Sequence, residues 1–149
     1  MKKIFFLTTI LFTAAFFSQS VKAQTEAQRI ELCTKAAGAD ATFQSSYPVR
    51  LEAAKPGQRP PDFKQGFGLI KGNKYRFTIC TDEESSSEAI LQLYDQGKMI
   101  GTSYISESGK TFQSFDFDCT KSAAYVIIIS FKDGKEGSAV AIVSHVKTL

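Results

Sequence analysis

The sequence predicts an all-β protein, an antiparallel jelly-roll-like β-sandwich preceded by a short N-terminal helix. Two observations favour this class. Between Gly66 and Val146, short alternating apolar stretches are separated by turn signals about every 8–12 residues, which is typical of sandwiches. Near the end, Tyr125–Phe131 and Ala139–Val146 form two apolar runs rich in β-branched residues. The sequence shows no internal repeat of the kind that indicates a propeller or solenoid.

Residues 1–23 are predicted to be a signal peptide. Lys2 and Lys3 precede an apolar run, Ile4–Phe17, and small residues lead to a cleavage site after Ala23. The run is shorter than the roughly 20 residues that span a bilayer, so we expect no membrane span in the mature chain. A periplasmic or secreted protein is therefore predicted.

The formal charge of +3 comes from the leader, because Lys2, Lys3 and Lys22 lie there and no acidic residue does. The chain after Ala23 therefore has a net charge near zero. Such a balance does not favour a nucleic-acid partner or an anionic membrane surface. Residues 24–149 have the length of a single domain.

One short helix is predicted at about residues 25–37. Thr25 is placed to cap its first turn, with Gln28 three residues later completing a capping box. Gly38 follows as a stop signal.

The strands are predicted from alternation of apolar and polar residues. Thr42–Leu51 contains Pro48, which indicates an edge strand. Lys55–Gln65 contains three prolines and is predicted to be a loop. Further strands are expected at Asn73–Cys80, Ala89–Tyr94, Met99–Ile105 and Thr111–Cys119.

The charged residues predict how the strand at Asn73–Cys80 pairs with the strand at Thr111–Cys119. An antiparallel register with Arg76 opposite Asp116 also places Lys74 opposite Asp118 on the outer face. A slip of one residue would turn the phenylalanines of these strands to solvent, so the register is strongly specified.

The run Tyr125–Phe131 is apolar on both faces, which predicts a strand in the middle of a sheet with both faces covered. Asp133-Gly134 and Gly137 supply turn residues before Ala139–Val146. We therefore expect the two runs to form a central hairpin.

These strands resemble the small extracytoplasmic β-sandwich modules of the pre-peptidase C-terminal type, over about Gly66–Val146. The resemblance implies a jelly-roll-like sandwich used as an accessory or binding module, and it carries no catalytic residue. The positions that match the family's three motifs are Gly72, Tyr75 and Phe77; Leu91, Leu93, Tyr94, Asp95 and Gly97; and Tyr125, Ile127 and Ile129. The chain departs from the third motif at one position, where Ala123 or Ala124 stands in place of the usual glycine.

Three cysteines follow the predicted leader, in a compartment that permits disulfides. Cys80 and Cys119 should lie at opposite ends of their paired strands, too far apart for a bridge. We therefore expect Cys33 to pair with Cys119 or Cys80. The alternative is that all three are free and buried.

The residues do not favour catalysis. The sequence has one histidine, His145, and it lacks the G-x-S-x-G elbow of serine hydrolases. A non-enzymatic protein is predicted, with a small hydrolase based on His145 as the least favoured alternative.

Two sets of side chains are candidates for binding. Asp82, Glu83 and Glu84 crowd an acidic loop with Glu88 and could hold calcium, the one cofactor that the sequence suggests, although such a run is more often solvated. A second set consists of aromatic residues that could stack on sugars or anchor a protein, or that could instead pack under the helix and the long loop: Tyr94, Tyr104 and Phe112.

The predicted function is that of a binding or accessory module that engages a protein or glycan partner in the cell envelope or outside the cell. The alternative is a structural or assembly subunit that pairs through an open strand edge. The sequence does not specify the oligomeric state.

Overall fold

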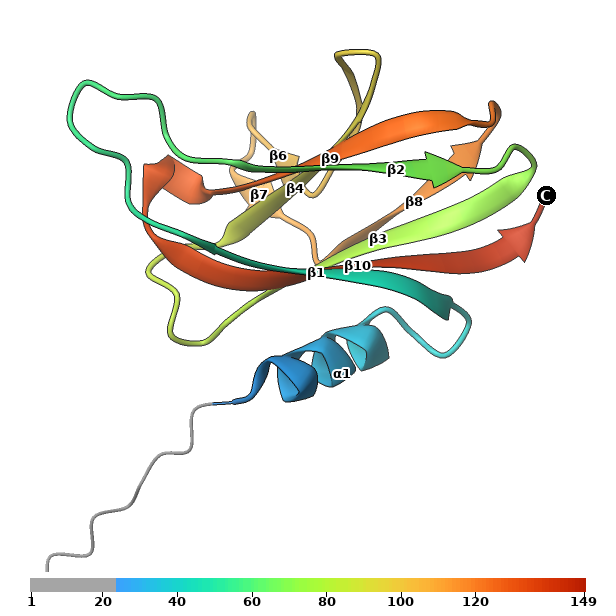
Figure 1. Ribbon diagram of the computed structural model, residues 1–149, viewed down its shortest axis with the longest axis horizontal. Coiled ribbons are helices and arrows are strands. Elements are labelled where there is room, and N and C mark those ends of the chain that lie inside the picture. The colour runs from blue at the N-terminus through green and yellow to red at the C-terminus, as the bar shows by residue number, and fades with distance from the viewer. Residues whose placement is uncertain (1–23) are drawn as a thin grey trace, which may run out of the picture.

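The computed structural model describes residues 24–149 as two packed antiparallel sheets with one helix outside them (Figure 1). The predicted leader lies outside the described residues. The elements in chain order are α1 (Glu26–Ala36), β1 (Thr42–Leu51), β2 (Phe63–Leu69), β3 (Asn73–Thr81), β4 (Ala89–Asp95), β5 (Lys98–Thr102), β6 (Tyr104–Ile105), β7 (Lys110–Thr111), β8 (Ser114–Cys119), β9 (Ala123–Phe131), the 3₁₀ turn η1 (Lys132–Gly134) and β10 (Gly137–Thr148).

The strand order confirms the predicted sandwich and gives it a jelly-roll topology. One sheet runs β1-β10-β3-β8 and the other β2-β9-β4-β5, while β6 and β7 form a separate small ribbon. Counted in chain order, the eight longer strands are arranged 1-8-3-6 and 2-7-4-5, which is the double-sheet jelly-roll order. In this topology most successive strands alternate between the two sheets.

The core lies between the sheets and consists of alternate residues from facing strands. Its fully buried large side chains include Phe77 of β3, Leu91 and Leu93 of β4, and Ile127 and Ile129 of β9. Burial of large apolar side chains stabilises the fold by about 1.5–3 kcal/mol each. Aromatic rings stack in the same layer, with Phe77 and Phe115 centroids 5.3 Å apart.

The helix α1 begins and ends as predicted. The Thr25 hydroxyl accepts a hydrogen bond from the Gln28 amide, and the Gln28 side chain accepts one from the Thr25 amide. Gly38 follows the last turn with a positive φ of 96°. The helix covers the outer face of β10, where Val140 and Ile142 are buried beneath it.

Two expectations about the final third of the chain are wrong. The strand buried on both faces is β10, because α1 covers it, whereas β9 is central in its sheet but leaves Val126 37% exposed on the outer face. The two runs also do not form a hairpin. The turn at Asp133 and Gly134, both with positive φ, carries the chain from one sheet to the other.

The predicted pairing of β3 with β8 is confirmed. Arg76 lies opposite Asp116 and Lys74 opposite Asp118, and both form ion pairs on the outer face. Hydrogen bonds from the Arg76 guanidinium lower the pKa of the Asp116 carboxyl below its usual range.

The edges of the sheets differ from the prediction in detail. β1, which contains Pro48, is an edge strand as expected. β2 begins at Phe63, inside the stretch expected to be a loop. The strand expected at Met99–Ile105 is interrupted at Ser103, whose buried hydroxyl accepts a hydrogen bond from the Leu91 amide.

The disulfide joins Cys33 of α1 to Cys80 of β3, with Cα atoms 5.7 Å apart. This is one of the two pairings expected for Cys33. Cys119 is free and buried. Its partner residue across the ladder is Asn73, at the opposite end of β3 from Cys80, which is the reason Cys80 and Cys119 do not meet.

Candidate binding face

The two sheets differ in what covers their outer faces. α1 lies over the sheet that contains β10, whereas no described helix lies over the sheet β2-β9-β4-β5 (Figure 1). We call the outer surface of this second sheet the open face. Its members, read from the register of the strands, are Lys64, Gly66 and Gly68 of β2; Ala124, Val126, Ile128 and Ser130 of β9; Ile90, Gln92 and Tyr94 of β4; and Met99 and Thr102 of β5.

The centre of the open face is an apolar row across the four strands. Gly66 pairs with Val126, Val126 with Tyr94, and Tyr94 with Met99. Met99 is 46% exposed. The alternation of β4, which buries Leu93, turns Tyr94 outward, as the sequence indicated.

A second row lies beside the first and supplies polar groups. Gln92 stands next to Ile128 and Thr102 in the register. The Tyr94 hydroxyl donates to the side-chain oxygen of Gln92 at 3.4 Å, and the side-chain nitrogen of Gln92 donates to the Met99 sulfur at 3.4 Å. These contacts hold the tyrosine ring and the amide together on one exposed surface.

Glycines make one side of the open face flat. A Cβ at Gly68 would meet no atom within 4 Å, and one at Gly66 would only approach the Tyr125 carbonyl at 3.9 Å. Both positions would therefore accept a side chain, and their lack of one leaves the backbone of β2 accessible. A flat ligand can lie against such a surface without displacing a side chain.

The proline loop between β1 and β2 forms a rim at one end of the open face and encloses a shallow cavity of about 220 Å³. An apolar floor and several hydrogen-bonding groups meet there. The lining residues are Arg59, Pro60, Pro61, Asp62, Gln92, Tyr94, Ile128 and Ser130. Asp62 forms ion pairs with Arg59 and, at 3.7 Å, with Lys64.

The three aromatic residues predicted to bind a ligand are not brought together. The Lys132 ammonium lies 5.8 Å above the Tyr104 ring, so one face of that ring is occupied. Phe112 is 47% exposed and lines a different cavity, of about 280 Å³, with Ile79 and Thr81. Of the three, only Tyr94 lies within the cavity at the rim of the open face.

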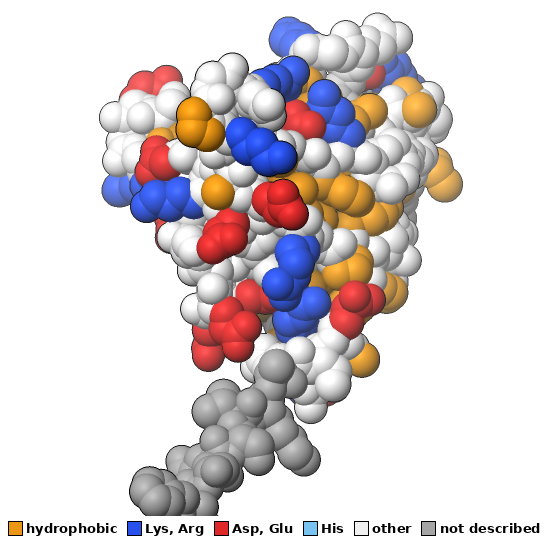
Figure 2. Space-filling view, turned by 60° about the vertical axis from the view of Figure 1, so that its left-hand side comes forward, with side chains coloured by type: hydrophobic (Ala, Val, Ile, Leu, Met, Phe, Trp, Pro, Cys, Tyr) orange, Lys and Arg blue, Asp and Glu red, His pale blue; other side chains and the backbone are white. Residues whose placement is uncertain are grey.

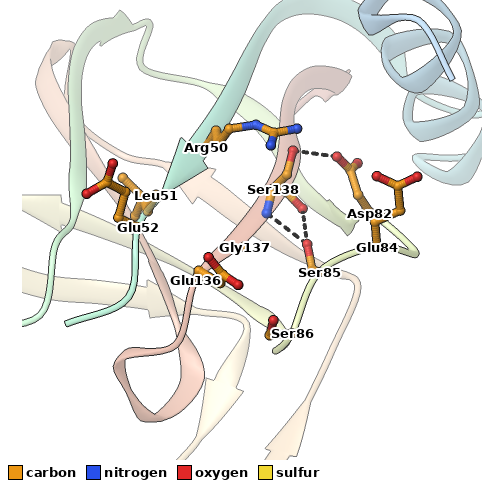
Figure 3. Close-up of a pocket in the computed structure, with 10 residues that line it drawn as sticks. All are labelled: Arg50, Leu51, Glu52, Asp82, Glu84, Ser85, Ser86, Glu136, Gly137 and Ser138. Carbon is orange, nitrogen blue, oxygen red and sulfur yellow. Dashed lines mark hydrogen bonds between the residues drawn. The ribbon is translucent and has the colours of Figure 1, made fainter. Parts of the chain in front are cut away.

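A cavity of about 360 Å³ lies at one end of the sandwich rather than on the open face (Figure 3). Three of its polar side chains, those of Asp82, Ser85 and Ser138, are used by the fold. The Ser138 hydroxyl donates to Asp82, which also forms an ion pair with Arg29 of α1. The Ser85 hydroxyl accepts from the Ser138 amide at 2.8 Å and donates to its carbonyl at 2.7 Å. This network ties the acidic loop to β10 and to the helix.

The acidic residues predicted to hold calcium do not form a cluster. Asp82 is engaged by Arg29 and Ser138, and Glu83 and Glu84 line separate cavities. Among residues 24–149, no group of three acidic, histidine or cysteine side chains is arranged to hold a metal ion.

His145 lies near the end of β10 and is half-buried. Its Nε2 is 3.0 Å from the Asn73 side-chain oxygen, and its ring packs edge-on against Tyr75. Asn73 thus occupies the position that an acid would take in a histidine–acid pair.

Charged side chains of both signs are interspersed on the side of the molecule shown in Figure 2, with apolar side chains gathered at its right. Within the described part of the chain, no helix is long and apolar enough to cross a membrane.

Sequence reasoning identified Tyr94 but missed its neighbours. Gln92 shares the parity of Tyr94 on β4, which was a usable signal. Arg59, Asp62 and Ile128 reach the same cavity from distant parts of the chain, and only the jelly-roll topology brings them together.

Comparison of the chain with protein-family models and with curated proteins gives no match.

Proposed function

We propose that this protein is a non-enzymatic, extracytoplasmic binding module whose ligand-binding surface is the open face. The observation that carries the proposal is the difference between the two outer surfaces. One is covered by α1, and the other exposes Val126 and Met99 beside the half-buried Tyr94 and the hydrogen-bonding group of Gln92.

Exposed apolar side chains on neighbouring strands are a cost to a monomer in water unless they meet a ligand. Single exposed apolar residues are common, but contiguous patches mark binding sites. Val126, Tyr94 and Met99 are contiguous because the register places them in one row. The resemblance to pre-peptidase C-terminal modules and the predicted leader also favour an accessory role outside the cytoplasm.

The test compares retention of ligands by the native protein and by a variant of the open face. The protein is immobilised and exposed to an envelope and culture-fluid extract of its source, and the bound material is eluted and quantified. Val126→Asp should abolish retention, because it places a negative charge at the centre of the apolar row. Phe112→Asp is the control, since Phe112 is also exposed, at 47% against 37% for Val126, but lies elsewhere.

Equal retention by the native protein and Val126→Asp would contradict the proposal. Circular dichroism and the midpoint of thermal unfolding of each variant show whether its fold is intact, so that loss of binding is assigned to the surface. Adding a chelator in a parallel arm tests whether the acidic loop at Asp82 takes part.

The second candidate function is assembly through strand pairing. It is favoured by one observation: β1 and β2 are each hydrogen-bonded on one side only, so both sheets end in an open edge. Pro48 removes one backbone donor from β1 and weakens that edge as a template, which leaves β2 as the better one. A molecular mass that rises with protein concentration, and falls when Gly68 is replaced by Pro, would support assembly over ligand binding.

A further inference from the structure

The open face has a smaller footprint than a standard protein–protein interface. Four strands about 4.8 Å apart give a width of about 14 Å, and Ala124 to Ser130 at about 3.3 Å per residue gives a length of about 20 Å. The backbone footprint is therefore about 300 Å², whereas each partner in a stable protein complex buries roughly 800 Å² of accessible surface. It is comparable to the functional patches found on single domains.

A narrow, elongated ligand suits these dimensions. The apolar row crosses the strands from Gly66 to Met99 with Tyr94 as its aromatic member. Beside it stand neutral hydrogen-bonding groups, Gln92 and Ser130, of the kind that recognise hydroxyl groups. An aromatic surface flanked by amide and hydroxyl groups matches a chain of sugar rings, which have apolar faces and hydroxylated edges.

The charges of the open face and its rim are not balanced. Lys64 is the one ionised side chain among the open-face residues, and Arg59 stands at the rim. Both cations share a single carboxylate, Asp62, and even a single oxygen of it. One positive charge is therefore in excess beside Tyr94.

These two cations have hydrogen-bond donors to spare. The Arg59 side chain is 79% exposed and the Lys64 side chain 51% exposed. A guanidinium has five N–H donors and an ammonium three, and most of them face solvent here. An anionic group that meets their exposed N–H groups on the side away from Asp62 would form charge-assisted hydrogen bonds, which are stronger than neutral ones.

We infer that the ligand of the open face is an acidic glycan, a chain of sugars that carry carboxylate or sulfate groups. A sugar ring lies on Tyr94, its hydroxyls meet Gln92 and Ser130, and an anionic substituent meets the exposed N–H groups of Arg59 and Lys64. This inference rests on the proposed function and names the ligand class of the same surface.

The test measures binding of an oligogalacturonate by calorimetry, using protein purified from cells that express the full sequence in an oxidising compartment. The neutral probe is the same oligosaccharide with its carboxylates methyl-esterified, and a sulfated oligosaccharide forms the third arm. The acidic probes should bind, and the neutral ester should bind more weakly. Raising the salt from about 0.1 M to about 1 M shortens the screening length from about 10 Å to about 3 Å, so affinity for the acidic probes should fall.

Variants assign the contacts. Lys64→Gln and Arg59→Gln should each lower affinity for the acidic probes about two- to five-fold, the range of exposed ion pairs. Lys147→Gln, on the other sheet, is the matched control and should change nothing. Tyr94→Ala should lower affinity about three- to ten-fold, whereas Tyr94→Phe, which keeps the ring, should retain it.

Several outcomes would overturn the inference. Equal binding of acidic and neutral probes would exclude the charge argument, and unchanged binding by Lys64→Gln and Arg59→Gln would do the same. If no glycan binds but Val126→Asp still abolishes retention from the extract, the acidic-glycan inference fails while the binding function stands. If Val126→Asp has no effect on any binding, the proposed function itself fails.

Discussion

Arg76 holds Asp116 in a two-point contact across β3 and β8. Its Nε donates to one carboxylate oxygen at 2.7 Å and its Nη2 to the other at 3.1 Å. The remaining nitrogen, Nη1, donates to the Ala37 carbonyl at 2.9 Å and to Asp40 at 2.8 Å. One guanidinium therefore joins the sheet to the end of α1.

Replacing Arg76 by Gln should lower the free energy of unfolding by about 1–3 kcal/mol, because several charge-assisted hydrogen bonds are lost at once. Lys74→Gln, which breaks only the neighbouring pair with Asp118, should cost less than about 1 kcal/mol. Urea denaturation of both variants measures the difference. Equal losses would show that the link to the helix contributes nothing.

The disulfide between Cys33 and Cys80 should stabilise the protein by about 2–4 kcal/mol, since it closes a long loop in the unfolded chain. The double variant Cys33→Ala/Cys80→Ala should unfold at lower urea concentration than the native protein. Reductant should destabilise the native protein toward the variant and leave the variant unchanged. If reductant lowered the stability of the native protein and of the double variant equally, the disulfide would not stabilise the fold.

The ring of Phe131 lies against the backbone of Gly137, where a Cβ would come within 2.2 Å of the ring. Gly137→Ala should therefore cost about 1–3 kcal/mol, as overpacking in a core does. Gly68→Ala is the matched control in a strand with open space, and it should be neutral or stabilising by up to about 1 kcal/mol. Thermal unfolding of the two variants should give shifts of different size, and equal shifts would contradict the close packing of the ring.

Burial, and to a smaller extent a hydrogen bond with Cys119, raises the pKa of Tyr125 to about 12. The phenol is thus held neutral in the folded protein, and its hydroxyl donates to the Lys121 carbonyl at 2.7 Å. A raised pKa of this kind contributes stability below the unfolded value of about 10 and loses it as pH rises toward 12.

Stability measured between pH 9 and about 12 should therefore fall less steeply in Tyr125→Phe than in the native protein. At neutral pH the variant should be about 1 kcal/mol less stable, because the Lys121 carbonyl loses its hydroxyl donor and keeps only the Cys119 thiol. Tyr94→Phe, on the open face, provides the control and should follow the native curve. Parallel alkaline curves for the native protein and Tyr125→Phe would exclude this role.

Several features of the fold could be predicted because they are local or carry their own register. The capping box of α1 lies within four consecutive residues, and the pairing of Arg76 with Asp116 follows from parity and charge together. Pro48 marks an edge strand whatever the topology. Each of these signals is decided by neighbours in sequence or by a single pair of strands.

The coverage of the last two strands could not be predicted in the same way. β9 and β10 are both apolar on two faces, and which of them is buried twice depends on where α1 lies. That placement depends on contacts of Cys33 and Arg29 with residues far along the chain. β2 was missed in part because Gly66 and Gly68 interrupt its apolar pattern.

The binding face illustrates the same limit. Tyr94 was accessible to sequence reasoning because its parity is opposite to that of Leu93. The two cations, Arg59 and Lys64, come from a loop and from β2. These lie on the same face as β4 only because β9 pairs with β2 on one side and with β4 on the other.

Gln24, the first described residue, lines a cavity with Arg29, Leu32 and Cys33 of α1, and α1 lies on the opposite side of the sandwich from the open face (Figure 1). A fusion partner, surface linkage or purification tag joined upstream of the helix would thus lie on the side of the molecule opposite the open face. Immobilised by that end, the protein would display Tyr94 toward solution, and this orientation suits any assay in which the ligand is a long polymer.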